Sequence, residues 1–86
     1  MSDWSVYVLR CADNSLYTGV TTDLERRLLA HNGGTGAAYT RARLPVTLLY
    51  SEPAADRSAA LKRELQIKKL PRHRKLELIA ADGNSR

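Results

Sequence analysis

Hydrophobic positions along the chain follow two patterns, short apolar runs near the N-terminus and leucines at helical spacing after it. Residues 4–11 (WSVYVLRC) and 16–20 (LYTGV) are rich in β-branched and aromatic side chains, as β-strands are. The polar residues 13–15 (DNS) between them are typical of a turn. The two runs therefore predict a β-hairpin over residues 4–20.

The capping box Thr22-x-x-Glu25 opens the first predicted helix. We expect this helix to end at residues 32–34 (NGG), where a glycine can adopt the left-handed conformation. Residues 33–44 are expected to form a loop, and residues 46–51 (VTLLYS) a third strand.

Two further helices are predicted in the C-terminal part of the chain. Asp56 can cap a helix over about residues 57–70. Pro71 fits the first turn of another helix, which runs to about Ala81 with Gly83 beyond it. The complete order is β-β-α-β-α-α, which is typical of the α+β class.

The length and charge of the chain limit what it can do. Its 86 residues can close one modest core, so we expect one domain over residues 1–86, with its core at about 4–81 and a tail at 82–86. The net charge of +5 favours a polyanionic partner such as nucleic acid. A membrane surface is the alternative, but the sequence has no long apolar run and no signal segment. The single cysteine, Cys11, excludes an internal disulfide and fits an inert core position, so a cytoplasmic location is expected.

Helical periodicity separates two adjacent arginines. With Leu24 at zero and about 100° per residue, Leu28 lies at about 40° and defines a buried stripe. His31 lies at about 340° and Arg27 at about 300°, so both border this stripe. Arg26 lies at about 200° and is expected to face solvent.

The same reasoning applies to the second predicted helix. With Leu61 at zero, Leu65 lies at about 40°, and the two leucines define the expected buried stripe. Glu64 at about 300° and Lys68 at about 340° lie at its edge. A carboxylate there needs a partner, because burial of an unpaired charge is unfavourable.

Two tyrosines of the hairpin can point to the same side of the sheet. Side chains alternate along a strand, which places Tyr7 with Leu9 and Tyr17 with Gly19. Gly19 leaves room beside the phenols for something to approach the backbone. Two phenols, an arginine, a histidine and a carboxylate could then converge, a set that suits phosphoryl transfer better than acyl transfer or redox chemistry.

Phosphodiester hydrolysis uses residue types of this kind. An arginine offers paired donors to phosphate. One carboxylate can hold Mg²⁺ with water at the remaining positions, and the ion can stabilise the leaving oxygen. A tyrosine near a cation can lose its proton more readily and act as a base.

Together, these residues resemble the signature of the GIY-YIG nuclease superfamily. The resemblance covers about residues 4–80 and rests on the segments SVY at 5–7 and YTG at 17–19, and on Arg27, His31 and Glu64. Within the superfamily the chain is most similar to the small standalone single-domain bacterial (YhbQ-like) group. The resemblance implies a three-stranded antiparallel sheet flanked by helices. It also implies a metal-dependent endonuclease that uses Mg²⁺ or Mn²⁺, acts on DNA rather than RNA, selects structure rather than sequence, and serves repair or recombination.

Each matching residue has a role that the resemblance implies. Tyr7 matches the general base, and Tyr17 matches the tyrosine that positions water or phosphate. Gly19 matches the glycine that keeps the site open. Arg27 matches the arginine that contacts the scissile phosphate, and His31 stands at a position that is often histidine.

Glu64 matches the single metal-binding glutamate of the family. Beyond the signature, we expect the loop after the first helix to contact the substrate, with Tyr39, Thr40, Arg41 and Arg43 as candidates. Lys68 is expected to contact the substrate from the second helix. The late asparagine of some family members has no clear match, since Asn84 lies in the tail.

Three positions depart from the family pattern without removing a catalytic group: Ser5, Val6 and Thr18. The chain also lacks an appended recognition domain, which argues against sequence-specific cutting. Two alternatives to an active nuclease therefore stay open: a non-catalytic nucleic-acid-binding module, or a nuclease subunit that depends on a protein partner for recognition.

Simpler structural roles are also open for the same residues. Tyr7 and Tyr17 could be strand aromatics, and Arg27 with Glu64 could be a structural salt bridge. Trp4 is expected to pack on the sheet. The basic residues of the last two helices could form a solvated face: Lys68, Lys69, Arg72, Arg74 and Lys75.

Overall fold

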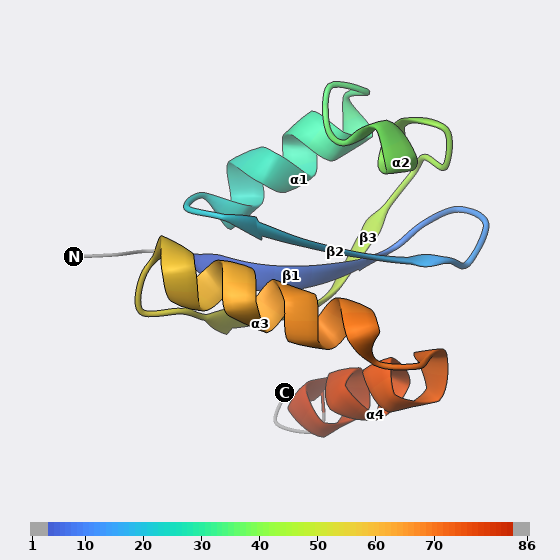
Figure 1. Cartoon of the computed structure of the whole chain (residues 1–86). Helices are drawn as coiled ribbons and strands as arrows, with labels where there is room; N and C mark the ends of the chain where they lie inside the picture. The colour runs from blue at the N-terminus through green and yellow to red at the C-terminus, as the bar shows by residue number, and fades with distance from the viewer. Residues whose placement is uncertain (1–3, 84–86) are drawn as a thin grey trace.

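The computed structural model describes residues 4–83. It consists of a three-stranded antiparallel sheet with helices on both faces (Figure 1). The strands are β1 (Ser5–Arg10), β2 (Leu16–Thr21) and β3 (Thr47–Pro53), in the order β2-β1-β3. The helices are α1 (Leu24–Asn32), α2 (Ala38–Arg41), α3 (Arg57–Lys69) and α4 (Arg72–Gly83). Helices α1 and α2 lie over one face of the sheet, and α3 and α4 lie under the other. The expected α+β fold is confirmed, with the short α2 as an addition.

The register of the β1–β2 hairpin places both tyrosines on one face, as predicted. Tyr7 pairs with Gly19, and Leu9 pairs with Tyr17. The turn is closed by a bond from the Cys11 N–H to the Ser15 carbonyl at 2.8 Å. Asn14 adopts a positive φ of 69° within it, a conformation that asparagine tolerates better than most residues.

β1 is the central strand, and both of its faces are buried. Its odd-numbered residues Tyr7 and Leu9 belong to the core under α1, together with Cys11. Its even-numbered residues Val6 and Val8 belong to a second core against α3 and α4, where Trp4 also packs. A strand covered on both sides explains the continuous apolar run in this part of the sequence. The predictions that Cys11 is a core residue and that Trp4 packs on the sheet are confirmed.

The cap of α1 differs from the prediction by one residue. Asp23, and not Thr22, is the N-cap, because its carboxylate accepts from the Arg26 N–H at 3.1 Å. The hydroxyl of Thr21 accepts from the Asp23 N–H at 3.1 Å and helps to hold the cap. α1 ends at Asn32, and Gly34 takes the left-handed conformation with φ +83°.

Other segment boundaries shift as well. The predicted loop at residues 33–44 contains the single helical turn of α2, which is too short to show a periodic apolar pattern. β3 extends to Pro53, which an edge strand can accommodate because one of its edges forms no ladder bonds. α4 continues past Ala81 to Gly83, so part of the expected tail is helical. Asn84 lies outside the described residues.

The predicted buried stripe of α3 is wrong. Leu61 is 37% exposed and Leu65 is 54% exposed, whereas Ala60 and Ile67 are fully buried against the sheet. Apolar residues occur on two faces of this helix, and the small Ala60 side chain allows the helix to approach the sheet closely. Glu64 follows Ala60 by four residues and precedes Ile67 by three, so it shares their face of the helix.

Within residues 4–83, no helix has the length and apolar character needed to cross a membrane.

Candidate active site

A chain of hydrogen bonds under α1 connects three buried side chains. The Thr40 hydroxyl donates to the Ala37 carbonyl at 2.9 Å, which uses its only proton. The same oxygen lies 2.8 Å from His31 Nδ1. It must therefore accept a hydrogen bond from an Nδ1–H group. His31 Nε2 is then the unprotonated ring nitrogen, and it accepts from the Tyr7 hydroxyl at 3.0 Å.

Arg27 completes this arrangement from the same helix as His31. Its Nε donates to the Tyr7 oxygen over 3.4 Å, so the phenol lies between a cation and an imidazole. Burial lowers the pKa of His31, and the positive charge of Arg27 lowers it further. The imidazole is therefore neutral near pH 7 and able to accept a proton.

The Tyr7 phenol does not lose its proton as easily as we expected for a tyrosine beside a cation. Burial raises the pKa of Tyr7, and this outweighs the lowering effect of the Arg27 hydrogen bond. The negative charges that Tyr17 and Glu64 can carry raise it further. Tyr7 therefore stays protonated at neutral pH and needs a partner that takes its proton.

The structure changes the interpretation of Gly19. A Cβ atom at this position would lie 2.5 Å from the Tyr7 hydroxyl oxygen and 2.6 Å from the adjoining ring carbon. The space over Gly19 is thus filled by the Tyr7 phenol and is not left open to a ligand. Gly36 has a similar function for His31, because a Cβ there would lie 2.8 Å from the His31 Cα.

Tyr17 lies beside this group on the outer strand. Its ring centroid is 6.4 Å from that of Tyr7 and 5.4 Å from that of His31. It also stacks on Tyr39 of α2, at 6.0 Å with an interplanar angle of 24°. The pKa of Arg27 is raised, first by its bond to Tyr7 and also by Tyr17, which places the guanidinium near both phenols.

Glu64 approaches from the helical layer on the other face of the sheet. Its side chain is 18% exposed, and it forms an ion pair with Lys68 at 3.2 Å. The ion pairs among residues 4–83 do not include one between Arg27 and Glu64, so that structural salt bridge is not formed. Its charge also acts on the Tyr7 phenol, as the smallest of the effects on the Tyr7 pKa.

Glu64 is also the residue that could hold a metal ion. Within the described part of the chain, no group of three or more His, Cys, Asp or Glu side chains could bind one. Mg²⁺ does not need such a group, because it usually keeps several waters and binds one or two carboxylates and the substrate phosphate. A single half-buried carboxylate therefore fits this ion.

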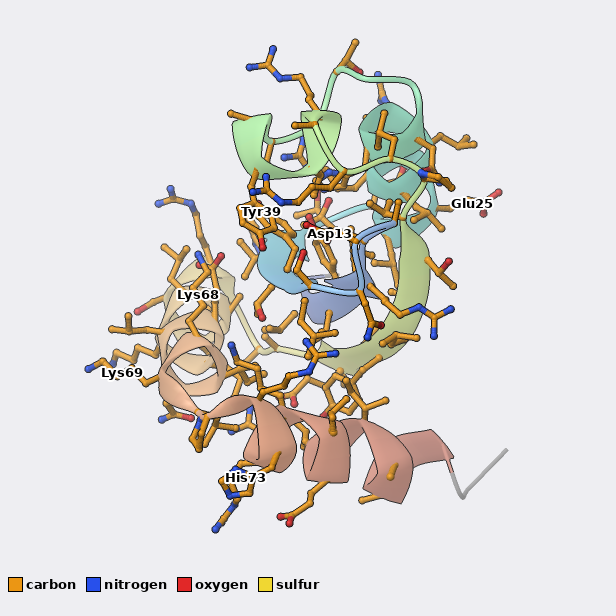
Figure 2. All side chains as sticks on the ribbon, turned by 90° about the vertical axis from the view of Figure 1, so that its right-hand side faces the viewer. Asp13, Glu25, Tyr39, Lys68, Lys69 and His73 are labelled. Atoms are coloured by element: carbon orange, nitrogen blue, oxygen red, sulfur yellow. The ribbon has the colours of Figure 1, made fainter. Side chains whose placement is uncertain are left out.

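The residues predicted to contact substrate differ in their surroundings. Tyr39 and Lys68 line the same hollow, next to Tyr17. They lie on the same side of the molecule in Figure 2. Arg41 is exposed on α2 and does not line that hollow.

The sequence predicted only substrate contact for Thr40 and Arg43 and missed the supporting roles of both residues. Thr40 is fully buried and orients His31. The Arg43 guanidinium lies 4.0 Å from the centre of the Tyr39 ring and bonds Asp13 at 3.0 Å. Neither role has a sequence signal, since both contacts depend on how α2 folds back onto the sheet.

Comparison with known proteins gives a consistent result. Residues 3–77 match the GIY-YIG catalytic domain. The chain is 48% identical over 79 residues to a UPF0213 protein of Staphylococcus haemolyticus (strain JCSC1435), covering 92% of this chain and 96% of the relative. It is 52% identical over 79 residues to a UPF0213 protein of Natronomonas pharaonis, covering 92% of this chain and 93% of the relative.

Solved structures extend the likeness to the fold. The solution NMR structure of a UPF0213 protein from Bacillus halodurans is 40% identical, with a TM-score of 0.61, and covers 93% of this chain and 85% of that one. The solution NMR structure of a protein from E. faecalis is 41% identical, with a TM-score of 0.62, and covers 95% of this chain and 88% of that one.

Proposed function

Because this chain belongs to the GIY-YIG catalytic domain family, we propose that it is an endonuclease that hydrolyses nucleic-acid phosphodiester bonds with a divalent metal ion. The observation that carries this proposal is the position of the Tyr7 phenol, held between a neutral His31 and the Arg27 guanidinium. A simple strand tyrosine would not need a buried imidazole on one side and a cation on the other.

Tyr7 and His31 form a path for one proton. When water attacks phosphorus, its proton can pass to the Tyr7 oxygen while the Tyr7 proton passes to His31 Nε2. Water loses one proton and His31 gains one, so the phenol never carries a full negative charge. This path explains how a tyrosine with a raised pKa can serve as the base near pH 7.

Arg27 and Tyr17 are proposed to hold the phosphate. The guanidinium is always charged and can donate paired hydrogen bonds to non-bridging oxygens. A phosphate bound to it places phosphorus beside the Tyr7 oxygen, which is itself bonded to Arg27. Tyr17 is near Arg27 and Tyr7 and could orient either the phosphate or the attacking water.

Glu64 is proposed as the metal-binding residue. A divalent ion bound there, Mg²⁺ or Mn²⁺, would supply Lewis-acid stabilisation of the negative charge that develops on the leaving oxygen. Binding of the ion would compete with Lys68 for the Glu64 carboxylate. Lys68 would then be available for a substrate phosphate.

We further propose that the substrate is DNA and that the domain, residues 1–86, selects its shape rather than its sequence. Basic residues on α4 are exposed, among them Arg72 and Arg74. Such residues contact phosphates, which position a protein on nucleic acid without reading sequence. A cytoplasmic role in repair or recombination would suit this selectivity, and a protein partner could add recognition.

A panel of labelled DNA and RNA substrates, comprising single strands, flaps, branches and duplexes, tests this function. We expect the purified protein to cut at least one substrate with Mg²⁺ or Mn²⁺ and none with EDTA. Glu64→Ala should abolish cutting while circular dichroism shows a folded protein. Glu25→Ala is the matched control, because Glu25 is exposed in the first turn of α1. Equal cutting by the Glu64→Ala protein contradicts the proposal.

The second candidate is a nucleic-acid-binding module without catalysis. It is favoured by the pairing of Glu64 with Lys68, since this carboxylate is already neutralised. The same panel distinguishes the two functions. Salt-sensitive binding with no metal-dependent product on any substrate would support the second.

A further inference from the structure

A hollow of about 260 Å³ lies at the outer edge of β2, next to the proposed catalytic residues. Its lining residues come from the sheet edge and from the helices on both sides of it: Leu16, Tyr17, Thr18, Tyr39, Lys68 and Lys75. The hollow thus lies around the free edge of the sheet and combines aromatic, apolar and basic surface. Pockets for small ligands begin at about 300 Å³, so a hollow of about 260 Å³ could hold no more than one nucleotide.

Tyr39 is the aromatic wall of this hollow, and its orientation is held by its neighbours. The ring is 40% exposed, yet Tyr17 stacks against it and the Arg43 guanidinium lies over it. Arg43 also donates to the Tyr39 carbonyl at 2.8 Å and to Asp13 at 3.0 Å, which ties α2 to the hairpin turn. The part of the ring that stays exposed is therefore held rigidly, and a base could pack against it.

Two lysines form the basic side of the hollow. Lys68 is paired with Glu64, whereas Lys75 takes part in none of the ion pairs among residues 4–81, whose side chains the structure describes. Lys75 is also the less exposed of the two, although it lies in a helix with many exposed charges. Lys69 is adjacent to Lys68 in sequence but points outward and does not line the hollow (Figure 2).

We propose that this hollow is a subsite for one unstacked nucleotide next to the cleaved bond. Its base would lie against the exposed part of the Tyr39 ring, and its phosphate would lie between Lys75 and Lys68. The proposal rests on the proposed nuclease function and adds Lys75 and Tyr39 as binding residues. Since every base has an aromatic face, the subsite would accept any base while requiring one that can leave the stack.

Binding without cleavage tests the lysine. Fluorescence anisotropy in EDTA would follow a labelled single-stranded oligonucleotide of mixed sequence at several salt concentrations. For Lys75→Ala we expect the slope of log affinity against log salt to fall by about 0.7, as for the loss of one phosphate contact with a single strand. Lys69→Ala removes the same charge outside the hollow and should leave the slope unchanged. Equal slopes for the two variants would overturn the subsite.

Stacking is tested with abasic substrates. One abasic residue is moved stepwise along a substrate that the wild-type protein cuts. We expect one position next to the cut where the missing base weakens binding by about fivefold or more, as for the loss of one stacking contact. Tyr39→Leu should bind intact and abasic substrates equally at that position. An identical abasic penalty in wild type and Tyr39→Leu contradicts the proposal.

These experiments separate the subsite from the nuclease function. If Tyr39→Leu and Lys75→Ala both cleave as wild type does, the subsite is overturned and the nuclease proposal stays intact. If no substrate is cut, the nuclease proposal fails. In that case the abasic scan measures binding instead of cleavage. The difference between the salt slopes of Lys75→Ala and Lys69→Ala still decides whether the hollow binds a nucleotide.

Discussion

The hydroxyl of Thr40 gives the most specific prediction about the buried hydrogen-bond chain. Thr40→Val keeps the shape of the side chain and removes the acceptor for His31 Nδ1–H. Thr40 and His31 are both fully buried, so water cannot replace the lost oxygen without rearrangement. The Ala37 carbonyl keeps its bonds from the backbone N–H groups of Thr40 and Arg41, which leaves the imidazole as the main group affected.

An unsatisfied buried donor costs about 1–3 kcal/mol, and we expect Thr40→Val to lower the free energy of unfolding by that amount. If the imidazole instead changes tautomer, its Nε2–H would point at Tyr7 and could no longer take the Tyr7 proton. If the loss of this proton acceptor raises the reaction barrier by the same 1–3 kcal/mol, the cleavage rate falls about 5- to 150-fold.

Urea unfolding followed by circular dichroism measures the stability change. NMR correlation of the imidazole nitrogens and ring protons reports the tautomer directly. Thr35→Val is the control, because its hydroxyl forms an exposed bond to the Ala30 carbonyl and should change stability by less than about 0.5 kcal/mol. An Nε2–H tautomer of His31 in the wild-type protein, or equal stability of the two variants, would refute the reasoning.

Two further predictions concern the same group. Gly19→Ala places a Cβ where the Tyr7 phenol lies. We therefore expect urea unfolding to show a destabilisation of about 1–3 kcal/mol, and we expect a lower cleavage rate. Unchanged stability would show that Tyr7 moves freely. Burial lowers the pKa of His31 in the folded protein below the value of about 6.5 that a histidine has in the unfolded chain. Between these two pKa values the unfolded chain binds more protons than the folded protein. The free energy of unfolding should therefore fall as the pH drops below about 6.5. Unfolding midpoints measured from pH 7.5 to 5 test this. The midpoint of His31→Gln should decrease less than that of wild type, whereas His73→Gln, which changes an exposed residue, should match wild type. Equal pH dependence of the midpoint in both variants contradicts this assignment.

Elements with a strong local pattern were predictable from the sequence. The β1–β2 hairpin has two apolar runs and a polar turn, and its register follows once Tyr7 and Tyr17 share a face. The prediction that Arg26 faces solvent while Arg27 borders the core was also confirmed, because Leu24 and Leu28 do pack against the core under α1. In these cases one periodic signal and one buried face agree.

The prediction failed where one element has apolar residues on two faces. The leucines of α3 suggested the wrong stripe, because alanine and isoleucine make the closer contact with the sheet. Glu64 was nevertheless placed at the edge of a buried face, since it is near both stripes on the helix. The prediction that Glu64 is partly buried was therefore confirmed, although it followed from an incorrect helical face.

Contacts between distant segments were beyond sequence reasoning. Gly19 was expected to leave an open space, and only the structure shows that Tyr7 crosses it. Thr40 reaches His31 because a single turn of helix folds back over α1, and no periodic pattern marks so short a turn. Both features depend on how side chains fill space, which residue spacing does not report.

Single-turnover cleavage by two neighbouring arginine variants tests the central claim most directly. Arg27 is half-buried and bonds Tyr7, whereas Arg26 is exposed on the next position of α1 and carries the same charge. If Arg27 holds the scissile phosphate, Arg27→Ala should lower the metal-dependent cleavage rate by about 100-fold or more, as expected for the loss of a charge-assisted contact in the transition state. Arg26→Ala should stay within about threefold of wild type, as expected for an exposed charge that does not bond Tyr7. Equal rates for the two variants would contradict an active site built on Tyr7, Arg27 and Glu64.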